Sequence, residues 1–413
     1  MASSVAGSAL IENFDAVVAG SPAVDRHEVF ARLRRALPVF YSASTNAWVV
    51  SRHADAKGVL EDSRSFAPVT QGPGASVFGG GFFHWSGREH SKKSGIVARR
   101  VRSPRALRVE VGGKVEQIAR AVADRLPFGR PVDLREEYAM WVPLLVISEL
   151  TAIEEATKLR HWYDTIMAGG TSSIGNPAAR EAGLEAMREL KEFLAPILDE
   201  RRAHPGDDLV SDLVSARYDG EPLPDSEIVS IVGQLLPAGV ETTERVLTSA
   251  FRHLARDREL WDRLSARRDS DDTLASFGAE ALRFYPPLQA ANRVAIADTE
   301  VAGRAIATGE KVIALLASAN RDAERFVNPT GFDPDRFAQN PDRQYTAAGD
   351  VLPFGAGEHH CTGSRLAKVE IVETLRALLD RIESIEMVEE APDTGGLILW
   401  SPASLRVVLH PRT

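Results

Sequence analysis

The sequence contains a single cysteine, Cys361, in a chain of 413 residues. One thiol cannot form a disulfide within the chain, so the fold has to rest on buried apolar surface, and a reducing compartment is expected. One thiol is also too few for an iron–sulfur cluster, which usually needs four, or for a cysteine-rich zinc site. Cys361 therefore remains free for another kind of metal binding or for catalysis.

Basic charge and long apolar runs are also scarce. The formal net charge is −9 at pH 7, which argues against a nucleic-acid partner because a polyphosphate requires a basic face. The most apolar run, residues 140–147, is far shorter than the ~20 residues that a membrane helix needs. The N-terminus has no basic region followed by an apolar core, so no secretory signal is expected. The sequence predicts a cytoplasmic protein with no nucleic-acid and no membrane partner.

The motifs of several common enzyme classes are missing. The glycine-rich segments 72–81 and 355–363 match neither a dinucleotide-binding loop nor a P-loop. The serines lack the G-x-S-x-G elbow of many hydrolases, and no H-E-x-x-H pair indicates a zinc protease. Nucleotide-binding, serine-hydrolase and most zinc-enzyme functions are therefore disfavoured.

Helical periodicity dominates what is present, and the hydrophobic content of 44% suffices for a large buried core. No linker divides the chain, so we expect one mainly α (α+β) domain over residues 1–413 with small β-sheets. Pro196 should kink the helix that contains it. Helices are expected over 114–126, 181–202, 226–256, 273–285 and 364–382, and strands over 47–51, 311–316 and 404–409.

The segment around Cys361 is the most informative part of the sequence. It reads F-G-A-G-E-H-H-C-T-G over residues 354–363 and directly precedes a predicted helix, whose N-terminal N–H groups favour a thiolate. Its glycines let the backbone approach a flat cofactor and donate N–H groups to the sulfur. A buried structural thiol in a glycine-rich turn is the alternative. A single thiolate on iron points to haem.

This segment resembles the F-G-x-G-x-H-x-C-x-G haem loop of the cytochrome P-450 superfamily, in its soluble bacterial form. The resemblance implies that Cys361 is the axial ligand of haem b, iron-protoporphyrin IX. It also implies a cytochrome P-450 fold in which the haem lies between a long central helix and the cysteine-bearing loop and helix. Further haem contacts are expected from four residues of the loop, Phe354, Gly355, His359 and Gly363.

Residues 238–243 (AGVETT) of the long predicted helix resemble the A-G-x-[DE]-T-T oxygen-activation segment of the family. The resemblance implies that Ala238 and Gly239 lie against the haem, with Gly239 leaving room for O2. It also implies that Thr242 and Glu241 are the catalytic residues that handle protons. Cleavage of O2 consumes two protons, and an alcohol beside an acid suits that task.

Two local features qualify this segment. Glu241 and Arg245 are one turn apart, so the alternative role of Glu241 is a structural ion pair. Pro237 removes a backbone hydrogen bond directly before the segment and should kink or widen the helix there.

A second motif, E-x-x-R at Glu280 and Arg283, places both charges on one helix face. The resemblance implies a structural role for this pair, which would bond to an arginine of a downstream meander, here Arg336. We do not assign it to catalysis.

The resemblance also implies three partners for the haem propionates, Arg293, His359 and His90, and a guanidinium suits such a carboxylate. The sequence departs from the family four residues after His90, where Ser94 replaces the usual arginine. Lys92 or Lys93 is the alternative source of that charge.

The substrate pocket is expected above the haem, where an aromatic, glycine-hinged flap over 77–85 could cover an apolar ligand. Ordinary core packing is the alternative for each wall residue, and Gln289 and Asn292 offer polar recognition. The substrate is expected to be small to medium in size and apolar or aromatic. The predicted substrate-binding residues are Phe78, Phe82, Phe83, Leu236, Leu288, Gln289, Asn292 and Leu399, with Ala238 beside them.

No flavin- or ferredoxin-like segment is recognised, so electrons are expected from a separate ferredoxin and ferredoxin reductase. A basic cluster offers a docking surface for the acidic ferredoxin, although charge runs are usually solvated helix faces. A monomer is the default expectation. The predicted activity is a monooxygenase that uses O2 for hydroxylation or oxidative dealkylation. The alternatives are a peroxide-driven or oxidative-coupling haem-thiolate enzyme and a haem-thiolate ligand sensor. The basic cluster comprises Lys92, Lys93, Arg99, Arg100, Arg102, Arg105, Arg365 and Lys368.

Overall fold

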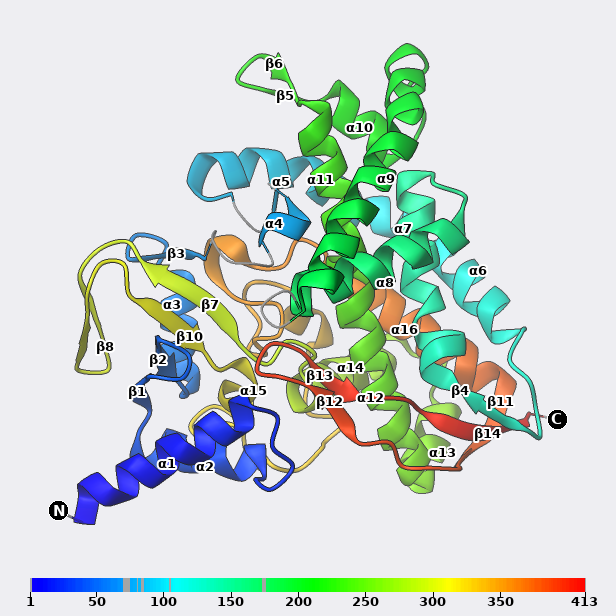
Figure 1. Ribbon diagram of the computed structural model, residues 1–413. Helices are drawn as coiled ribbons and strands as arrows, with labels where there is room; N and C mark the ends of the chain where they lie inside the picture. Colours follow the sequence, from blue (N-terminus) through cyan, green and yellow to red (C-terminus); the bar gives the residue numbers. More distant parts are fainter. Residues whose placement is uncertain are drawn as a thin grey trace.

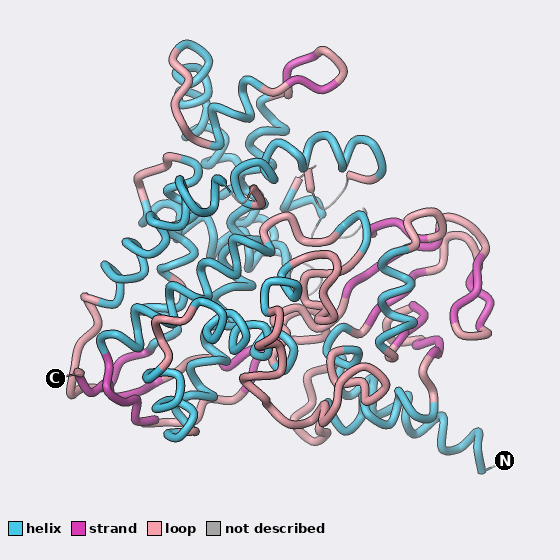
Figure 2. The backbone as a smooth tube through the Cα atoms, turned by 180° about the vertical axis from the view of Figure 1, so that it is seen from behind, coloured by secondary structure: helices cyan, strands magenta, loops and turns pink. Residues whose placement is uncertain are grey.

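The computed structural model describes residues 2–69, 75–79, 81–82, 85–103, 105–172 and 176–412. Helices form the larger part, and the main sheet lies at one side with the N-terminal helices beneath it (Figure 1). The view from behind shows the same division, with the two chain ends at opposite sides (Figure 2). This arrangement confirms the predicted mainly α fold with small sheets.

Apolar residues at helical spacing form most of the core, which buries one stripe of each helix. The α-helices are α1 (Ala2–Val18), α2 (Arg26–Ala36), α3 (His53–Glu61), α4 (Ala75–Phe78), α5 (Gly87–Val101), α6 (Gly112–Ala123), α7 (Trp141–Thr151), α8 (Ala156–Ser172), α9 (Pro177–Ala203), α10 (Leu209–Ser215), α11 (Asp225–Leu236), α12 (Thr242–Arg256), α13 (Arg258–Ala266), α14 (Asp271–Phe284), α15 (Leu316–Ala319) and α16 (Ser364–Arg381). Shorter π- and 3-10 turns are η1 (Ala106–Val111), η2 (Arg135–Ala139), η3 (Pro237–Glu241), η4 (Pro341–Tyr345) and η5 (Gly357–His359).

The largest sheet has the order β1-β2-β10-β7-β3, in which β10 runs parallel to β2 and the other pairs are antiparallel. A second sheet has the order β11-β14-β4, and three two-stranded pairs are β12-β13, β5-β6 and β8-β9. The strands are β1 (Val39–Ser42), β2 (Ala47–Val50), β3 (Phe66–Pro68), β4 (Pro131–Asp133), β5 (Arg217–Tyr218), β6 (Glu221–Pro222), β7 (Ala291–Ala295), β8 (Thr299–Val301), β9 (Arg304–Ile306), β10 (Lys311–Ala314), β11 (Ile382–Met387), β12 (Asp393–Gly395), β13 (Trp400–Pro402) and β14 (Arg406–Pro411).

The long helix expected over 226–256 is built from three pieces, α11, the π-turn η3 and α12. Pro237 opens the π-turn, which confirms the predicted widening, because proline has no N–H for the α-helical hydrogen bond. The predicted helices around α6, α9, α14 and α16 also form, and α9 continues through Pro196. The strand expected over 311–316 ends at Ala314, and α15 begins two residues later.

Within the described residues, no helix combines the length and the apolarity that crossing a membrane requires.

Candidate functional site

The loop that carries Cys361 is shaped by glycines. Gly355 and Gly357 have φ values of 70° and 69°, in the left-handed region that favours glycine. A Cβ on Gly357 would meet backbone atoms of Leu60 and Glu61 at 2.8 Å, so α3 packs directly against the loop. The Cys361 N–H donates to the Phe354 carbonyl at 2.8 Å, which closes the loop before α16 begins.

The Cys361 thiol is exposed within this loop, yet protein surrounds it. Burial raises the pKa of the thiol, while the backbone N–H groups of Gly363 and Ser364 bond to the sulfur and oppose that rise. The Arg102 guanidinium also favours the thiolate. The sulfur can thus be reached by a ligand and has donors that stabilise a negative charge.

On the π-turn η3, Ala238 is exposed, whereas Pro237 and Val240 on either side are buried. Thr242 is partly exposed, and its hydroxyl donates to the Ala238 carbonyl at 3.0 Å. The predicted role of Gly239 in making room for O2 stays a prediction, and the structure adds a packing role. A Cβ on Gly239 would meet Ile147 Cδ1 at 2.8 Å, so its lack of a side chain lets α7 approach the helix.

Glu241 is buried and fully engaged, so the structural ion pair predicted as its alternative role is present. Arg245 binds one carboxylate oxygen, and the Tyr163 hydroxyl from α8 donates to the other. Burial and the nearby Glu241 charge raise the pKa of Tyr163. Arg245 also donates to Ser401 Oγ of β13 at 2.8 Å, so Arg245 connects Glu241 to the β12-β13 hairpin.

The three predicted propionate partners come together in the structure. The rings of His90 and His359 lie 4.4 Å apart, and Glu358 lies within 4.0 Å of both. Burial, and then the charges of His90 and Arg293, lower the pKa of His359 to about 4. Arg293 on β7 is buried with 8% of its surface exposed, and burial lowers its pKa.

Lys93 does not supply the charge that Ser94 lacks. Its ammonium group binds Glu89 at 2.7 Å and Glu227 at 2.6 Å. The Ser94 hydroxyl donates to the His90 carbonyl at 2.5 Å, so it serves the backbone of α5. Lys92 is exposed on the same helix.

The E-x-x-R pair forms the predicted structural cluster. Glu280 and Arg283 are fully buried and make two contacts of 2.7 Å, and Arg336 reaches Glu280 at 3.0 Å. Arg283 also donates to three backbone carbonyls of the meander, those of Asn320, Pro329 and Gly331. The contact predicted for Arg336 is confirmed, and the cluster anchors the chain that leads to the Cys361 loop.

Several predicted pocket residues lie on or beside two segments of the chain that pair with each other. Leu288 and Leu399 form a β-bridge, and both are partly exposed. Gln289 is buried; its side-chain amide donates to the Pro286 carbonyl, and its Oε1 has no partner. Asn292 is exposed on β7.

The remaining residues predicted to line the pocket lie in different environments. Leu236 is fully buried among core residues, so its side chain belongs to the core and not to a ligand-facing wall. Phe78 packs against α8, where a Cβ on Gly170 would collide with its ring. Phe82 stacks edge-on against Trp85 with centroids 5.2 Å apart. Phe83 lies outside the described residues.

The predicted basic cluster is partly neutralised. Arg100 pairs with Asp207 and Asp212, and Lys368 pairs with Asp342. Arg365 Nη1 donates to the Arg102 carbonyl at 3.5 Å, so the end of α5 lies beside the start of α16. We call Arg102, Arg105 and Arg365 the basic patch; none of the three has an acidic partner in the described ranges.

The residues that meet here suit a haem with an axial thiolate. Cys361 offers a reachable sulfur with two N–H donors. Arg293 is a buried cation whose one hydrogen bond within the described chain goes to the neighbouring Asn292 carbonyl, at 3.0 Å. A buried guanidinium of this kind requires an anion, and His90 and His359 beside it complete a set of donors for propionates.

The cytochrome P450 family model matches residues 148–270 and 273–404, which together make up more than half of the chain. The chain belongs to the cytochrome P450 family. As members of this family bind haem, this P450 has haem as its cofactor and is a haem-thiolate monooxygenase.

Relatives of this P450 match along nearly its whole length. Nocardicin C N-oxygenase of Nocardia uniformis subsp. tsuyamanensis is 32% identical, covering 94% of this chain and 97% of that protein. Linalool 8-monooxygenase of Pseudomonas putida is 27% identical, covering 94% and 96%. The crystal structure of substrate-free CYP109E1 from Bacillus megaterium has a TM-score of 0.83 and 26% identity, covering 94% of this chain and 99% of that chain.

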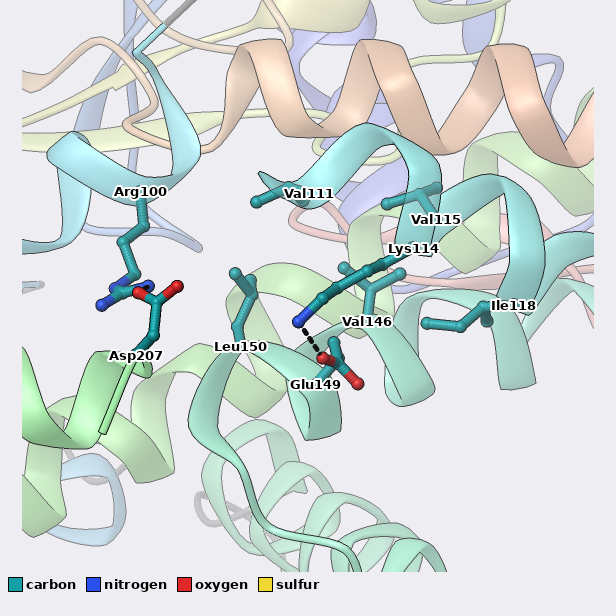
Figure 3. Close-up of a pocket in the computed structure, with 9 residues that line it drawn as sticks. All are labelled: Arg100, Val111, Lys114, Val115, Ile118, Val146, Glu149, Leu150 and Asp207. Atoms are coloured by element: carbon teal, nitrogen blue, oxygen red, sulfur yellow. Dashed lines mark hydrogen bonds and ion pairs between the residues drawn. The ribbon is translucent and has the colours of Figure 1, made fainter. Parts of the chain in front are cut away.

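Sequence reasoning missed Tyr163 and Ser401, which lie 78 residues before and 160 after Glu241 in the chain and carry no motif. It also missed a small hollow of about 30 Å3 between α6 and α7 (Figure 3). Lys114 and Glu149 form an ion pair over its apolar floor. A hollow of this volume has room for about one water molecule.

Proposed function

We propose that Cys361 would bind the haem iron of this P450 through its sulfur, and that Arg293, His90 and His359 would hold the haem propionates. Residues 1–413 would act as one domain that oxidises a small-to-medium apolar or aromatic substrate, by hydroxylation or oxidative dealkylation, with electrons from a ferredoxin. The observation that carries this proposal is the reachable Cys361 sulfur with its two backbone donors. Bound haem would supply the binding and reduction of O2.

The chain's own residues on the central helix would manage protons. Thr242 holds a partly exposed hydroxyl next to the exposed Ala238, so this hydroxyl would be able to donate a hydrogen bond or pass on a proton. Glu241 lies one residue earlier but is engaged by Arg245 and Tyr163. To deliver a proton, the Glu241 carboxyl group has to break its contacts with Arg245 and Tyr163. We therefore propose that Glu241 delivers protons only when these contacts open.

The substrate class rests on the wall residues and on the relatives. Leu288 and Leu399 present apolar side chains, and the Arg245–Ser401 contact keeps the hairpin with Leu399 next to the central helix. The relatives include a linalool 8-monooxygenase, and CYP109E1 was also solved in complex with testosterone. Linalool and testosterone are both largely apolar molecules.

The proposal of a ferredoxin as electron donor is based on the basic patch. Arg102 acts on Cys361 electrostatically, so the patch lies close to the proposed axial ligand. These three cations have no acidic partner among the described residues, which favours an acidic ferredoxin that would dock near the haem.

Absorption spectroscopy under carbon monoxide tests the axial ligand. We expect the dithionite-reduced protein to show a strongly red-shifted Soret band, and Cys361→His to show an unshifted band. Thr242→Ala should keep the shifted band but divert electrons from product to peroxide. An unshifted band in the wild-type protein would refute thiolate ligation, and intact coupling in Thr242→Ala would refute the role of the hydroxyl.

A further inference from the structure

Two buried arginines lie where α2 packs against α15 and the β12-β13 hairpin, and neither belongs to the proposed haem site. Arg26 of α2 and Arg321, two residues after α15, each have 7% of their surface exposed. Within the described residues, no carboxylate lies within ion-pair distance of either guanidinium. Burying a charge without a counter-charge is costly, so both arginines need a partner that the described chain does not provide.

An aromatic ring covers one face of each guanidinium, and a carbonyl accepts one of its hydrogen bonds. Arg26 lies over Trp400, 3.6 Å from the ring centroid, and its Nη2 donates to the Gly396 carbonyl at 3.2 Å. Arg321 lies over the Phe284 ring at 3.8 Å, and its Nη2 donates to the Phe284 carbonyl at 2.9 Å. A further partner therefore has to approach in the plane of each guanidinium, where its N–H groups point.

Three N–H groups of the two guanidiniums have no acceptor in the described chain. They are those of Arg26 Nε, Arg26 Nη1 and Arg321 Nε, and all three nitrogens are shielded from solvent. Arginine keeps its proton when it is buried, so these groups stay donors. Charged N–H donors form their strongest hydrogen bonds with the oxygens of a carboxylate or a phosphate.

His27 of α2 shows that the two arginines lie close to one another. Burial lowers the pKa of His27 well below its usual value, and nearby positive charges lower it further, those of Arg321, Arg26 and Arg34. The Nδ1 atom of His27 is also buried and without a partner in the described structure. Arg34 is already engaged, because its Nη1 donates to the Ser318 carbonyl at 2.9 Å and to the Ser318 hydroxyl at 3.0 Å.

The acids of this region are engaged with other groups. Asp393 binds Arg252 at 2.7 Å, and Asp25 accepts from two backbone N–H groups at the start of α2. Burial lowers the pKa of Arg26 and of Arg321 to about 10, and the charges of the two acids oppose this fall only in part. Both guanidiniums remain charged at neutral pH.

We propose that Arg26 and Arg321, with His27 between them, bind a phosphate group, either free or carried by a small molecule. Two fixed positive charges match the double negative charge of a phosphate better than the single charge of a carboxylate. The phosphate oxygens would accept the three unpaired N–H groups. Because Arg26 also holds Gly396 and Trp400, a bound phosphate would tie α2 to the β12-β13 hairpin.

Thermal unfolding of the haem-loaded protein at constant ionic strength tests this site, with inorganic phosphate as the probe. We expect the midpoint to rise with phosphate along a curve that saturates, and acetate to require about tenfold higher concentrations. Arg26→Gln should raise the half-saturating phosphate concentration at least about tenfold, because it removes charged donors. The matched control is Arg35→Gln, at an exposed arginine of the same helix, which should keep the wild-type curve.

A second variant and a direct location keep the test decisive if Arg26→Gln does not fold. Arg321→Lys keeps the charge but removes the unpaired Nε–H, so it should also weaken phosphate binding about tenfold. Crystals soaked in selenate should show an anomalous peak within hydrogen-bond distance of Arg26 and Arg321. A rise of the midpoint that is the same in the wild type and the site variants, or a peak at exposed arginines only, would overturn the site. Tighter binding of acetate than of phosphate would overturn the choice of ligand.

Discussion

At the scale of single residues, the site depends on a few buried charges whose partners come from distant parts of the chain. Arg293 is the clearest case, because it is a buried cation for which the described chain offers no acid. The free-energy cost of burying this unpaired charge falls only when an anion pairs with it, so Arg293 favours the haem-loaded state.

Replacing Arg293 by Gln should therefore weaken haem binding. A charge-assisted hydrogen bond contributes about 1.5–3 kcal/mol, which corresponds to a roughly tenfold or greater rise in the rate of haem loss. Transfer of haem to an acceptor protein measures this rate. Arg304→Gln, at an exposed arginine of β9, is the control and should leave it unchanged. Equal rates in both variants would contradict the propionate assignment.

The Glu280 cluster permits a stability prediction. Glu280→Gln leaves the fully buried Arg283 without its counter-charge, so the free energy of unfolding should fall by about 3–5 kcal/mol. Asp335→Asn removes exposed pairs with Arg263 and Arg267 and should cost less than about 1 kcal/mol. Urea unfolding of the haem-loaded protein compares the two variants, and similar losses would argue against the anchoring role.

Burial raises the pKa of Glu370, on α16, to about 8, so its contribution to stability depends on pH. Between about pH 4.5 and 8 the unfolded chain has released this proton while the folded chain keeps it, so stability falls as pH rises. The slope is at most about 1.4 kcal/mol per pH unit. Glu370→Gln should remove it, so the variant gains on the wild type as pH rises from 5 to 8 in urea titrations. Parallel curves would contradict the raised pKa of Glu370.

At the scale of elements, the central helix shows how one proline and one glycine set the geometry of the site. Pro237 opens the π-turn η3, and the turn brings Ala238 to an exposed position between buried neighbours. Gly239 lets α7 approach the same turn through Ile147. The turn is therefore held from behind by α7 while its other side remains open.

Gly239→Ala should destabilise the protein by about 1–3 kcal/mol, because the new Cβ overpacks against Ile147 Cδ1. Ile147→Val removes that methyl group, so the double variant should recover part of the loss. Thermal unfolding of the two single variants and the double variant gives the coupling energy. Additive losses would show that the glycine does not serve the contact with α7.

At the scale of the whole molecule, the net charge of −9 contrasts with the basic patch beside the Cys361 loop. The negative net charge repels an acidic donor and the basic patch attracts it, so the charge distribution would orient the donor on the protein. This asymmetry makes the ferredoxin proposal testable by charge reversal.

Arg365→Glu should raise the ferredoxin concentration needed for half-maximal turnover by about tenfold at low salt, and the effect should shrink as salt increases. Peroxide-driven turnover should stay unchanged, which separates docking from damage to the site. Arg304→Glu makes the same charge change on β9 and is the control. An equal effect of both variants would contradict docking at the basic patch.

The local sequence determined the elements and the chemistry of single positions. The glycine spacing before Cys361 predicts a loop that ends at a helix, because the motif is contiguous and its geometry is local. Pro237 likewise predicts the widened turn, since the missing N–H is a property of that residue alone. Helical periodicity predicts the mainly α fold for the same reason.

Only the tertiary structure decided which side chains meet. Tyr163 and Ser401 join the Glu241 pairing from distant segments, Lys93 turns to Glu227, and Leu236 packs into the core. Such contacts depend on how helices pack, and side-chain direction on a helix changes by about 100° per residue, so a sequence pattern leaves them open. The same holds for Glu370, whose pKa is raised because the folded chain buries it.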